Sequence, residues 1–241
     1  MVHVKQCLIL AAGNGTRMRA VSASLPKPLV EFRGRPILEH VIGRAQEAHI
    51  DEFVVVVGYR GDLIREWFES RWTGKAHFTW VENAEYHKPN GISALKARNA
   101  LRGNFLLLMA DHLFAAATVK KLVQERLAPG EVILAVDPKI DHVFDIDDAT
   151  KVRRVGNLIV DIGKEIEPYD ALDTGMFGCS PALFDDLEAA NKEGNCSLSD
   201  GMRRLARQGR LRGLEIGDAQ WHDMDTPEAL AHADAESPVD A

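Results

Sequence analysis

The chain has 241 residues, of which 46% are hydrophobic and 27% charged, an ordinary balance for a soluble globular protein. Its formal net charge of −7 argues against a nucleic-acid-binding protein, which would carry a basic face. Three widely spaced cysteines suit neither a disulfide framework nor a zinc site, and no apolar run approaches the roughly 20 residues of a membrane helix. We therefore expect a cytoplasmic protein with no stable membrane insertion, and the sequence leaves a homodimer open.

Apolar runs of strand length alternate with helical patterns through the first half of the chain. The runs are continuous in Val, Ile and Leu, which is typical of a parallel sheet buried on both faces. We expect strands at residues 6–11, 53–57, 78–81, 105–109 and 132–136, and helices at 37–49, 63–72, 93–101 and 117–127. This alternation predicts a Rossmann-like, doubly wound α/β fold with a mostly parallel sheet, whose ligands bind beyond the carboxyl ends of the strands.

The second half has a different pattern. It predicts a β-hairpin at residues 151–161, helices at 182–191 and 198–208, a strand at 211–216, and a last helix capped by Thr226 with Pro227 in its first turn. The simplest division is one domain over residues 1–235 with a small hairpin lobe, followed by a frayed tail at 236–241.

A glycine-rich loop follows the first expected strand. The sequence LAAGNGTRM covers residues 10–18 and is followed by LPKPLV at residues 25–30. Glycines let backbone N–H groups approach phosphate oxygens, and Arg17 and Lys27 add two positive charges near the same anion. Met18 occupies the third small position of a dinucleotide fingerprint, and no Walker A run is present, so the loop belongs to another kind of phosphate site. Alone, it would also fit a tight strand-to-helix turn.

Two carboxylates stand at positions suited to a metal ion. Asp111 follows the expected strand 105–109, and Asp225 precedes the last helix. Mg²⁺ bound together with a phosphate ligand keeps several waters and takes only one or two protein carboxylates. Each residue also fits a structural role, Asp111 in a turn and Asp225 beside a helix cap.

The loop and its Lys-Pro pair resemble the signature of the sugar-phosphate nucleotidyltransferases, which have a Rossmann-like core. The resemblance implies that the loop wraps the triphosphate, that Asp111 and Asp225 hold Mg²⁺, and that the Asn90–Ser93 crossover contacts base and ribose. Asn90 and Ser93 fit a helix N-cap equally well. The nucleotide-binding half would span about residues 1–115. The implied nucleotide-binding residues are Leu10, Ala11, Ala12, Gly13, Gly15, Thr16, Arg17, Lys27, Asn90, Gly91, Ser93 and Asp111.

The acceptor-binding half would span about residues 116–235. The segments MADHLF, DIDDATKV, DIGKEIEPYDALDTGMF and WHDMDTPE are most similar to inositol-1-phosphate cytidylyltransferases, which condense CTP with inositol 1-phosphate to CDP-inositol and pyrophosphate. The resemblance implies catalytic roles for Arg17, Lys27 and Lys164, with Lys164 against the acceptor phosphate. The implied acceptor-binding residues are Lys164, Asp173, Thr174, Gly175 and Asp145.

Other functions stay open at this point. The acceptor could be another phosphorylated alcohol or phosphonate, such as phosphocholine or aminoethylphosphonate, because the acidic run Asp141, Asp145, Asp147 and Asp148 could surround a cation. A sugar 1-phosphate is a further alternative. A protein of another class, a non-catalytic nucleotide-sensing subunit, would be free to lose Asp111 and Asp225, and their presence argues against it.

Overall fold

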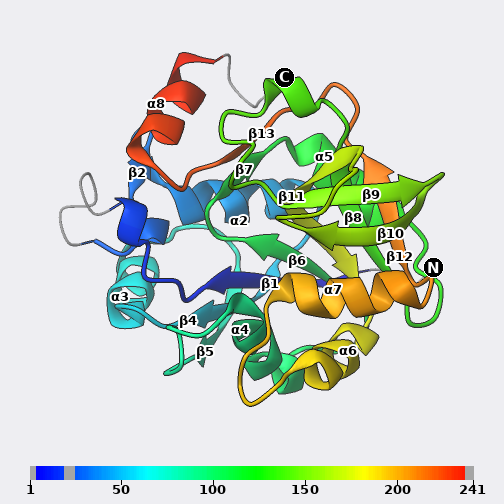
Figure 1. The fold of residues 1–241 in the computed structure, drawn as a ribbon. Helices are drawn as coiled ribbons and strands as arrows, with labels where there is room; N and C mark the ends of the chain where they lie inside the picture. The colour runs from blue at the N-terminus through cyan, green and yellow to red at the C-terminus, as the bar shows by residue number, and fades with distance from the viewer. Residues whose placement is uncertain (1–3, 19–24, 237–241) are drawn as a thin grey trace.

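One nine-stranded mixed sheet runs through the middle of the molecule (Figure 1). The computed structural model describes residues 4–18 and 25–236. The strand order is β5-β4-β1-β6-β11-β8-β12-β10-β9. The strands are β1 (Gln6–Ala11), β4 (Glu52–Val57), β5 (His77–Glu82), β6 (Phe105–Met109), β8 (Val132–Asp137), β9 (Lys151–Val155), β10 (Leu158–Gly163), β11 (Ala171–Cys179) and β12 (Leu211–Glu215).

The first four strands of this order are parallel and contain the point at which the winding reverses. The chain runs outward from β1 through β4 to β5 and then returns to place β6 on the other side of β1. The loops after β1 and β6 therefore leave the sheet side by side, and the Ala110 N–H donates to the Leu10 carbonyl at 3.3 Å. An open α/β sheet binds its ligands at such a reversal.

The predicted mostly parallel sheet is wrong for the second half, because the sheet is mixed. β11 is antiparallel to both β6 and β8, and β10 is antiparallel to β9 and β12. No α-helix connects β8, β9, β10 and β11. Of these pairs only β9–β10 is joined by a short turn, at residues 156–157, which a parallel pair could not use; the other antiparallel pairs join strands distant in the chain. The hairpin predicted at 151–161 is confirmed as β9–β10.

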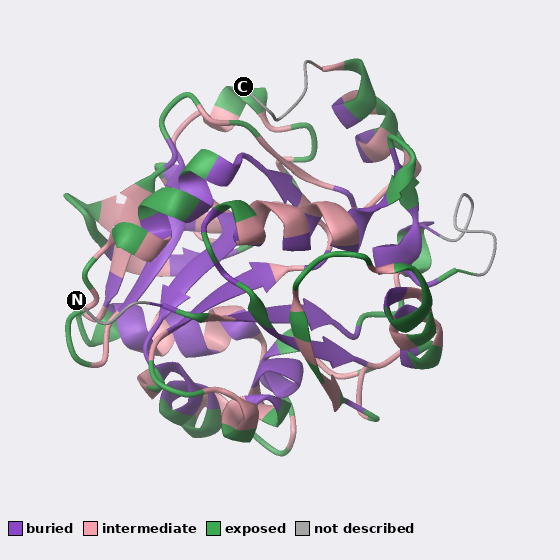
Figure 2. Ribbon diagram, turned by 180° about the vertical axis from the view of Figure 1, so that it is seen from behind, coloured by how far each residue is buried: buried purple, intermediate pink, exposed green. Residues whose placement is uncertain are grey.

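Helices cover both faces of the sheet, and successive residues of each central strand enter opposite cores. Leu8 packs with one group of helices, and Ile9 with the other. Figure 2 shows the strands buried between helices whose outer faces are exposed. The first group is α4 (Asn90–Lys96), α6 (Ala182–Ala190) and α7 (Leu198–Arg207); the second is α2 (Ile37–Glu47), α3 (Gly61–Arg71) and α5 (Ala116–Gln124).

Two very short strands that the sequence did not predict form a separate small sheet. They are β7 (His112–Phe114) and β13 (Trp221–Asp223), which pair antiparallel. The last helix, α8 (Pro227–Ala235), follows β13, and the Thr226 hydroxyl accepts from the Ala229 N–H at 3.1 Å, which confirms the predicted cap.

Two further strands, β2 (Glu31–Phe32) and β3 (Arg35–Pro36), form a hairpin. Short 3₁₀ turns lie at η1 (Thr16–Met18), η2 (Lys27–Leu29), η3 (Arg98–Ala100) and η4 (Ile140–His142).

Of the predicted frayed tail, Glu236 ends the described chain and residues 237–241 lie outside it. Within residues 4–18 and 25–236, every helix is too short or too polar to cross a membrane.

Candidate active site

The glycine loop forms a hollow of about 210 Å³ at the carboxyl ends of β1 and β6. Gly15 has φ +52°, and a Cβ there would lie 2.8 Å from the Lys27 Cβ, so the loop can close over Lys27 only with glycine at this position. Predicted nucleotide-binding residues form most of the hollow, namely Leu10, Ala11, Gly13, Gly15, Thr16, Arg17, Lys27 and Asp111.

Lys27 lies at the centre of a group of carboxylates. Its side chain is only 6% exposed, and its ammonium donates to Asp111 at 2.8 Å and to Asp225, with Asp223 at 3.9 Å. Burial alone would raise the pKa of Asp111, but the Lys27 ammonium and the His112 ring hold that pKa well below its usual range. The two predicted metal ligands therefore meet around one buried lysine.

The small sheet brings these carboxylates together. β13 places Asp223 opposite His112, and the Met224 N–H donates to the Asp111 carbonyl at 2.9 Å. Ligand atoms of Asp111, His112 and Asp223 all lie within 4.8 Å of one another. The buried Oδ1 atom of Asp223 has no hydrogen-bond partner. An unsatisfied carboxylate oxygen beside other oxygen donors fits a hard divalent cation such as Mg²⁺.

Asp148 joins two predicted catalytic cations. Arg17 donates to its Oδ2 at 2.6 Å, and Lys164 donates to its Oδ1. Arg17 also donates to Asp225, so one chain of ion pairs runs from Lys164 to Asp111. Burial would raise the pKa of Asp148, but the bonds from Lys164 and Arg17 lower it overall. The sequence placed Asp148 in an acidic run and gave no sign of this bridge.

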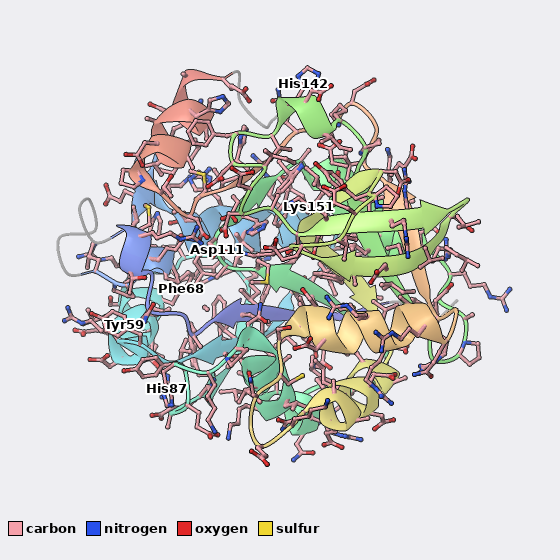
Figure 3. The ribbon with its side chains drawn as sticks, in the orientation of Figure 1. Tyr59, Phe68, His87, Asp111, His142 and Lys151 are labelled. Carbon is pink, nitrogen blue, oxygen red and sulfur yellow. The ribbon has the colours of Figure 1, made fainter. Side chains whose placement is uncertain are left out.

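A second hollow, of about 480 Å³, lies beside the first. Arg17, Asp111 and Asp225 line both hollows. In Figure 3 Asp111 lies near the middle of the molecule, and His142, which also lines this hollow, lies at the top. The predicted acceptor residues Asp145, Lys164, Asp173 and Gly175 line this second hollow, as does Asn90.

Asp173 and Gly175 sit where β11 passes the site. Gly175 has φ +74°, and a Cβ there would lie 2.7 Å from the Cδ2 of His112, so the ring fills the space that a side chain would need. Burial raises the pKa of Asp173 to about 6, although its carboxylate accepts from the Gly175 N–H at 2.8 Å.

Thr174 does not line the second hollow, contrary to the expectation that its hydroxyl binds the acceptor. Its side chain is fully buried and donates to the Ala135 carbonyl at 2.8 Å, where the register between β11 and β8 shifts. Neighbouring strand residues point to opposite faces, so Thr174 points away from the side that Asp173 and Gly175 occupy.

The Asn90–Ser93 crossover is the first turn of α4, and its polar groups have partners inside the protein. Asn90 accepts from the Leu198 N–H at 2.8 Å, and the buried Ser93 hydroxyl accepts from Asn83 at 2.9 Å. A Cβ on Gly91 would lie 2.6 Å from the Cys196 carbonyl, so this glycine allows α4 to approach α7. Ala12 is likewise buried, and its carbonyl accepts from the Tyr59 N–H.

The sequence reasoning missed the part played by His112. Its Nδ1 lies 2.9 Å from Asp111, and its ring stacks on Trp221 with 5.7 Å between centroids. Burial would lower the pKa of His112, but Asp223 and Asp111 raise it overall. The Asp-His pair directly after a central strand was the available signal.

The profile of the MobA-like NTP transferase domain matches residues 7–211. The chain belongs to this family. NTP transferases of this kind typically use a divalent metal, which agrees with the donors around Asp111.

Several relatives of this NTP transferase carry a more specific name. The present chain is 34% identical over 224 residues to the bifunctional IPC transferase and DIPP synthase of Rubrobacter xylanophilus. The match covers 92% of this chain and 49% of that protein. The Aquifex aeolicus protein of the same name is 30% identical and is covered over 51% of its length, against 95% of this chain. The chain thus spans about half the length of these curated relatives.

Solved structures agree on the fold. The inositol-1-phosphate CTP transferase from T. maritima superposes with a TM-score of 0.83 at 25% identity, over 94% of this chain and 91% of that one. A UDP-glucose pyrophosphorylase complexed with UDP-glucose superposes with a TM-score of 0.82 at 18% identity, covering 96% of this chain and 97% of the other, and shows the shared fold.

Proposed function

We propose that this NTP transferase condenses CTP with inositol 1-phosphate to give CDP-inositol and pyrophosphate. One observation carries the proposal: the glycine-loop hollow and the larger hollow meet at Arg17, Asp111 and Asp225. A triphosphate in the first and a phosphorylated acceptor in the second would bring their phosphates together at that junction. The choice of CTP and inositol 1-phosphate is supported by the names of the T. maritima and R. xylanophilus proteins.

Asp111 and Asp225 would hold Mg²⁺, with Asp223 beside them. The donors are carboxylate oxygens, the ligands that Mg²⁺ prefers in proteins. Bound there, Mg²⁺ would neutralise charge on the triphosphate. Lys27 neutralises the same carboxylates in the free protein, and with Mg²⁺ present its ammonium is available for phosphate oxygens.

The chemical step needs positioning more than proton transfer. An oxygen of the acceptor phosphate attacks the α-phosphorus of CTP, the bond from that phosphorus to the bridging oxygen breaks, and pyrophosphate leaves. A phosphate monoester is already anionic near pH 7, so no general base is required. Lys27 and Arg17 hold the triphosphate, and Lys164 holds the acceptor phosphate. These cations offset the repulsion between two anions that must come into contact.

Carboxylates on the acceptor side suit a ring rich in hydroxyl groups. Asp173 and Asp145 line the larger hollow and can accept hydrogen bonds from inositol hydroxyls. A pocket built to pair hydroxyls rejects analogues that lack them by roughly 10⁴-fold, because its polar groups would stay unpaired. The first turn of α4, with Asn90, is the proposed contact for the cytosine base and ribose.

The test is kcat/KM for pyrophosphate release, measured for four nucleotides against a panel of acceptors. We expect CTP with inositol 1-phosphate to exceed every other pair. Faster use of phosphocholine, aminoethylphosphonate or glucose 1-phosphate would contradict the acceptor assignment and leave the family assignment intact. No pyrophosphate release with any pair would instead favour a nucleotide-sensing subunit.

A further inference from the structure

Two histidines and a glutamate converge on the wall of the larger hollow, and the reaction described above gives none of them a role. His222 lies on β13, His232 on α8, and Glu236 caps the carboxyl end of α8. One ligand atom from each residue lies within 4.8 Å of the other two. The His222 Nε2 is 3.4 Å from one Glu236 oxygen, and the His232 Nε2 is 3.7 Å from the other.

Two ring nitrogens of this cluster are buried and make no hydrogen bond. They are the Nε2 of His222, which faces Glu236, and the Nδ1 of His232, whose Nε2 is the nitrogen that faces Glu236. His222 is 11% exposed, so water does not readily replace the missing bond. Buried polar atoms without partners are rare in folded proteins and call for an explanation such as an ion.

The cluster is separate from the carboxylates around Lys27. Consecutive residues on a strand point to opposite faces, so His222 lies on the other side of β13 from Trp221 and Asp223. Trp221 and Asp223 both contact His112, whereas the His222 ring lies 6.2 Å from that of His232. The two groups of donors share no residue, although both line the larger hollow.

The position of Glu236 is fixed by contacts at the end of α8. Arg33 donates to the backbone carbonyls of Asp234 at 3.0 Å and Glu236 at 3.1 Å, and to the Asp234 carboxylate at 3.1 Å. The Glu236 N–H donates to the His232 carbonyl at 3.2 Å, which keeps the two side chains on one face of the last turn. Two of the three donors are thus held together by the backbone.

We propose that His222, His232 and Glu236 bind a transition-metal ion such as Zn²⁺. Two imidazole nitrogens and one carboxylate oxygen are a typical three-residue donor set for zinc, with water in the fourth position. Donors that surround a tetrahedral ion at about 2.0–2.2 Å lie about 3.3–3.6 Å apart. Here the two nitrogen–oxygen separations are 3.4 and 3.7 Å, each to a different Glu236 oxygen, and the donors of all three residues lie within 4.8 Å of one another. Mg²⁺ prefers oxygen donors and is a poor fit to this set.

The bound ion would link β13 directly to α8. These two elements flank the segment that carries Asp225, with His222 three residues before it and His232 seven residues after it. An ion that binds only the folded protein raises its stability in proportion to the logarithm of its concentration above Kd. Zn²⁺ should therefore raise the thermal midpoint and hold this segment in place.

The test is titration calorimetry of the full chain with Zn²⁺ in excess Mg²⁺, together with thermal midpoints and the visible spectrum of bound Co²⁺. We expect His232→Gln and Glu236→Gln each to weaken Zn²⁺ binding by at least about 100-fold, more than the loss of an outer-shell partner costs. Both variants should abolish the Zn²⁺-dependent rise in midpoint. His142→Gln, which changes another histidine of the same hollow, should leave binding unchanged.

Asp223→Asn separates the two candidate sites. If Zn²⁺ instead binds at Asp111, His112 and Asp223, this variant loses it while His232→Gln retains it, and the proposal is overturned. Absence of tight Zn²⁺ binding to the wild-type chain overturns it as well. Circular dichroism and the metal-free thermal midpoint establish that each variant is folded; His232 and Glu236 are each 36% exposed, so these substitutions leave the core untouched.

Discussion

The Lys27 ammonium donates a hydrogen bond of 2.8 Å to the Asp111 carboxylate across 84 positions of sequence. The same nitrogen donates to Asp225. Because Lys27 is buried and the carboxylates around it are partly buried, its charge balances theirs in the free protein. In the proposed reaction, substrate and metal would therefore have to displace ion pairs that already exist in the free protein.

Lys27→Ala should both destabilise the free protein and weaken CTP binding. Loss of the ammonium leaves Asp111 and Asp225 without their shared donor, at a cost of about 1–3 kcal/mol in the free energy of unfolding. Urea unfolding and calorimetry with CTP measure the two effects. Lys121→Ala, at an exposed position on α5, is the control and should change neither. Full CTP affinity in Lys27→Ala would contradict the assigned role.

Asp111→Asn and Asp225→Asn should each lower turnover by about 100-fold or more, because each removes a carboxylate that we propose holds Mg²⁺ beside the reacting phosphates. The fold should survive, since both side chains are partly exposed and an amide oxygen can still accept from Lys27. Steady-state kinetics over a range of Mg²⁺ concentrations provides the measurement, and Asp62→Asn on α3 is the control. Near-normal turnover of Asp225→Asn would remove Asp225 from the site.

Lys164→Ala should raise the KM for the acceptor and slow turnover while leaving CTP affinity nearly unchanged. Lys164 is half-exposed and lines the larger hollow, whereas Lys27 lines the glycine-loop hollow. Calorimetry with CTP and acceptor-dependent kinetics distinguish the two lysines. Equal losses of CTP affinity in Lys27→Ala and Lys164→Ala would show that the division of roles is mistaken.

Asp173→Asn should stabilise the free protein at neutral pH. Burial raises the pKa of Asp173 to about 6, above the roughly 3.9 of an unfolded aspartate. The folded protein therefore retains a proton that the unfolded chain loses, so the stability due to this group falls as pH rises from about 4 to 6 and stays low above that.

The amide has no such penalty and can still accept from the Gly175 N–H. We expect a gain of about 1–3 kcal/mol at pH 7.5 that shrinks below pH 6 and disappears near pH 4. Denaturant unfolding at several pH values measures it, with Asp62→Asn for comparison. A gain that is constant between pH 4 and 7.5 would rule out titration of Asp173 as the cause.

The sequence was sufficient to predict those features that depend on a short stretch of neighbouring residues. The strand before Gly13, the Lys-Pro pair at Lys27 and the cap at Thr226 are all short-range features, and the structure places them as expected. Asp111 was predicted on the ligand side because it follows a central strand of an open α/β sheet, and the structure places it on the wall of both hollows.

Features that depend on distant partners were not predictable. Asp148 bridges Arg17 and Lys164 only because the loop between β8 and β9 folds back onto Arg17, which lies 131 residues earlier in the chain. Thr174 was expected to face the substrate because the sequence does not reveal where the β11–β8 register shifts. β7 and β13 have three residues each, too few to show a period.

The pairing of β7 with β13 has a consequence for how the site is maintained. These six residues form no part of the nine-stranded sheet, yet they hold Asp223 and Asp225 against Asp111. A short, separate ladder opens at lower free energy than a core sheet. Amide hydrogens of Leu113 and Met224 should therefore exchange faster than those of β1 and β6, and these carboxylates can separate while the main sheet stays folded.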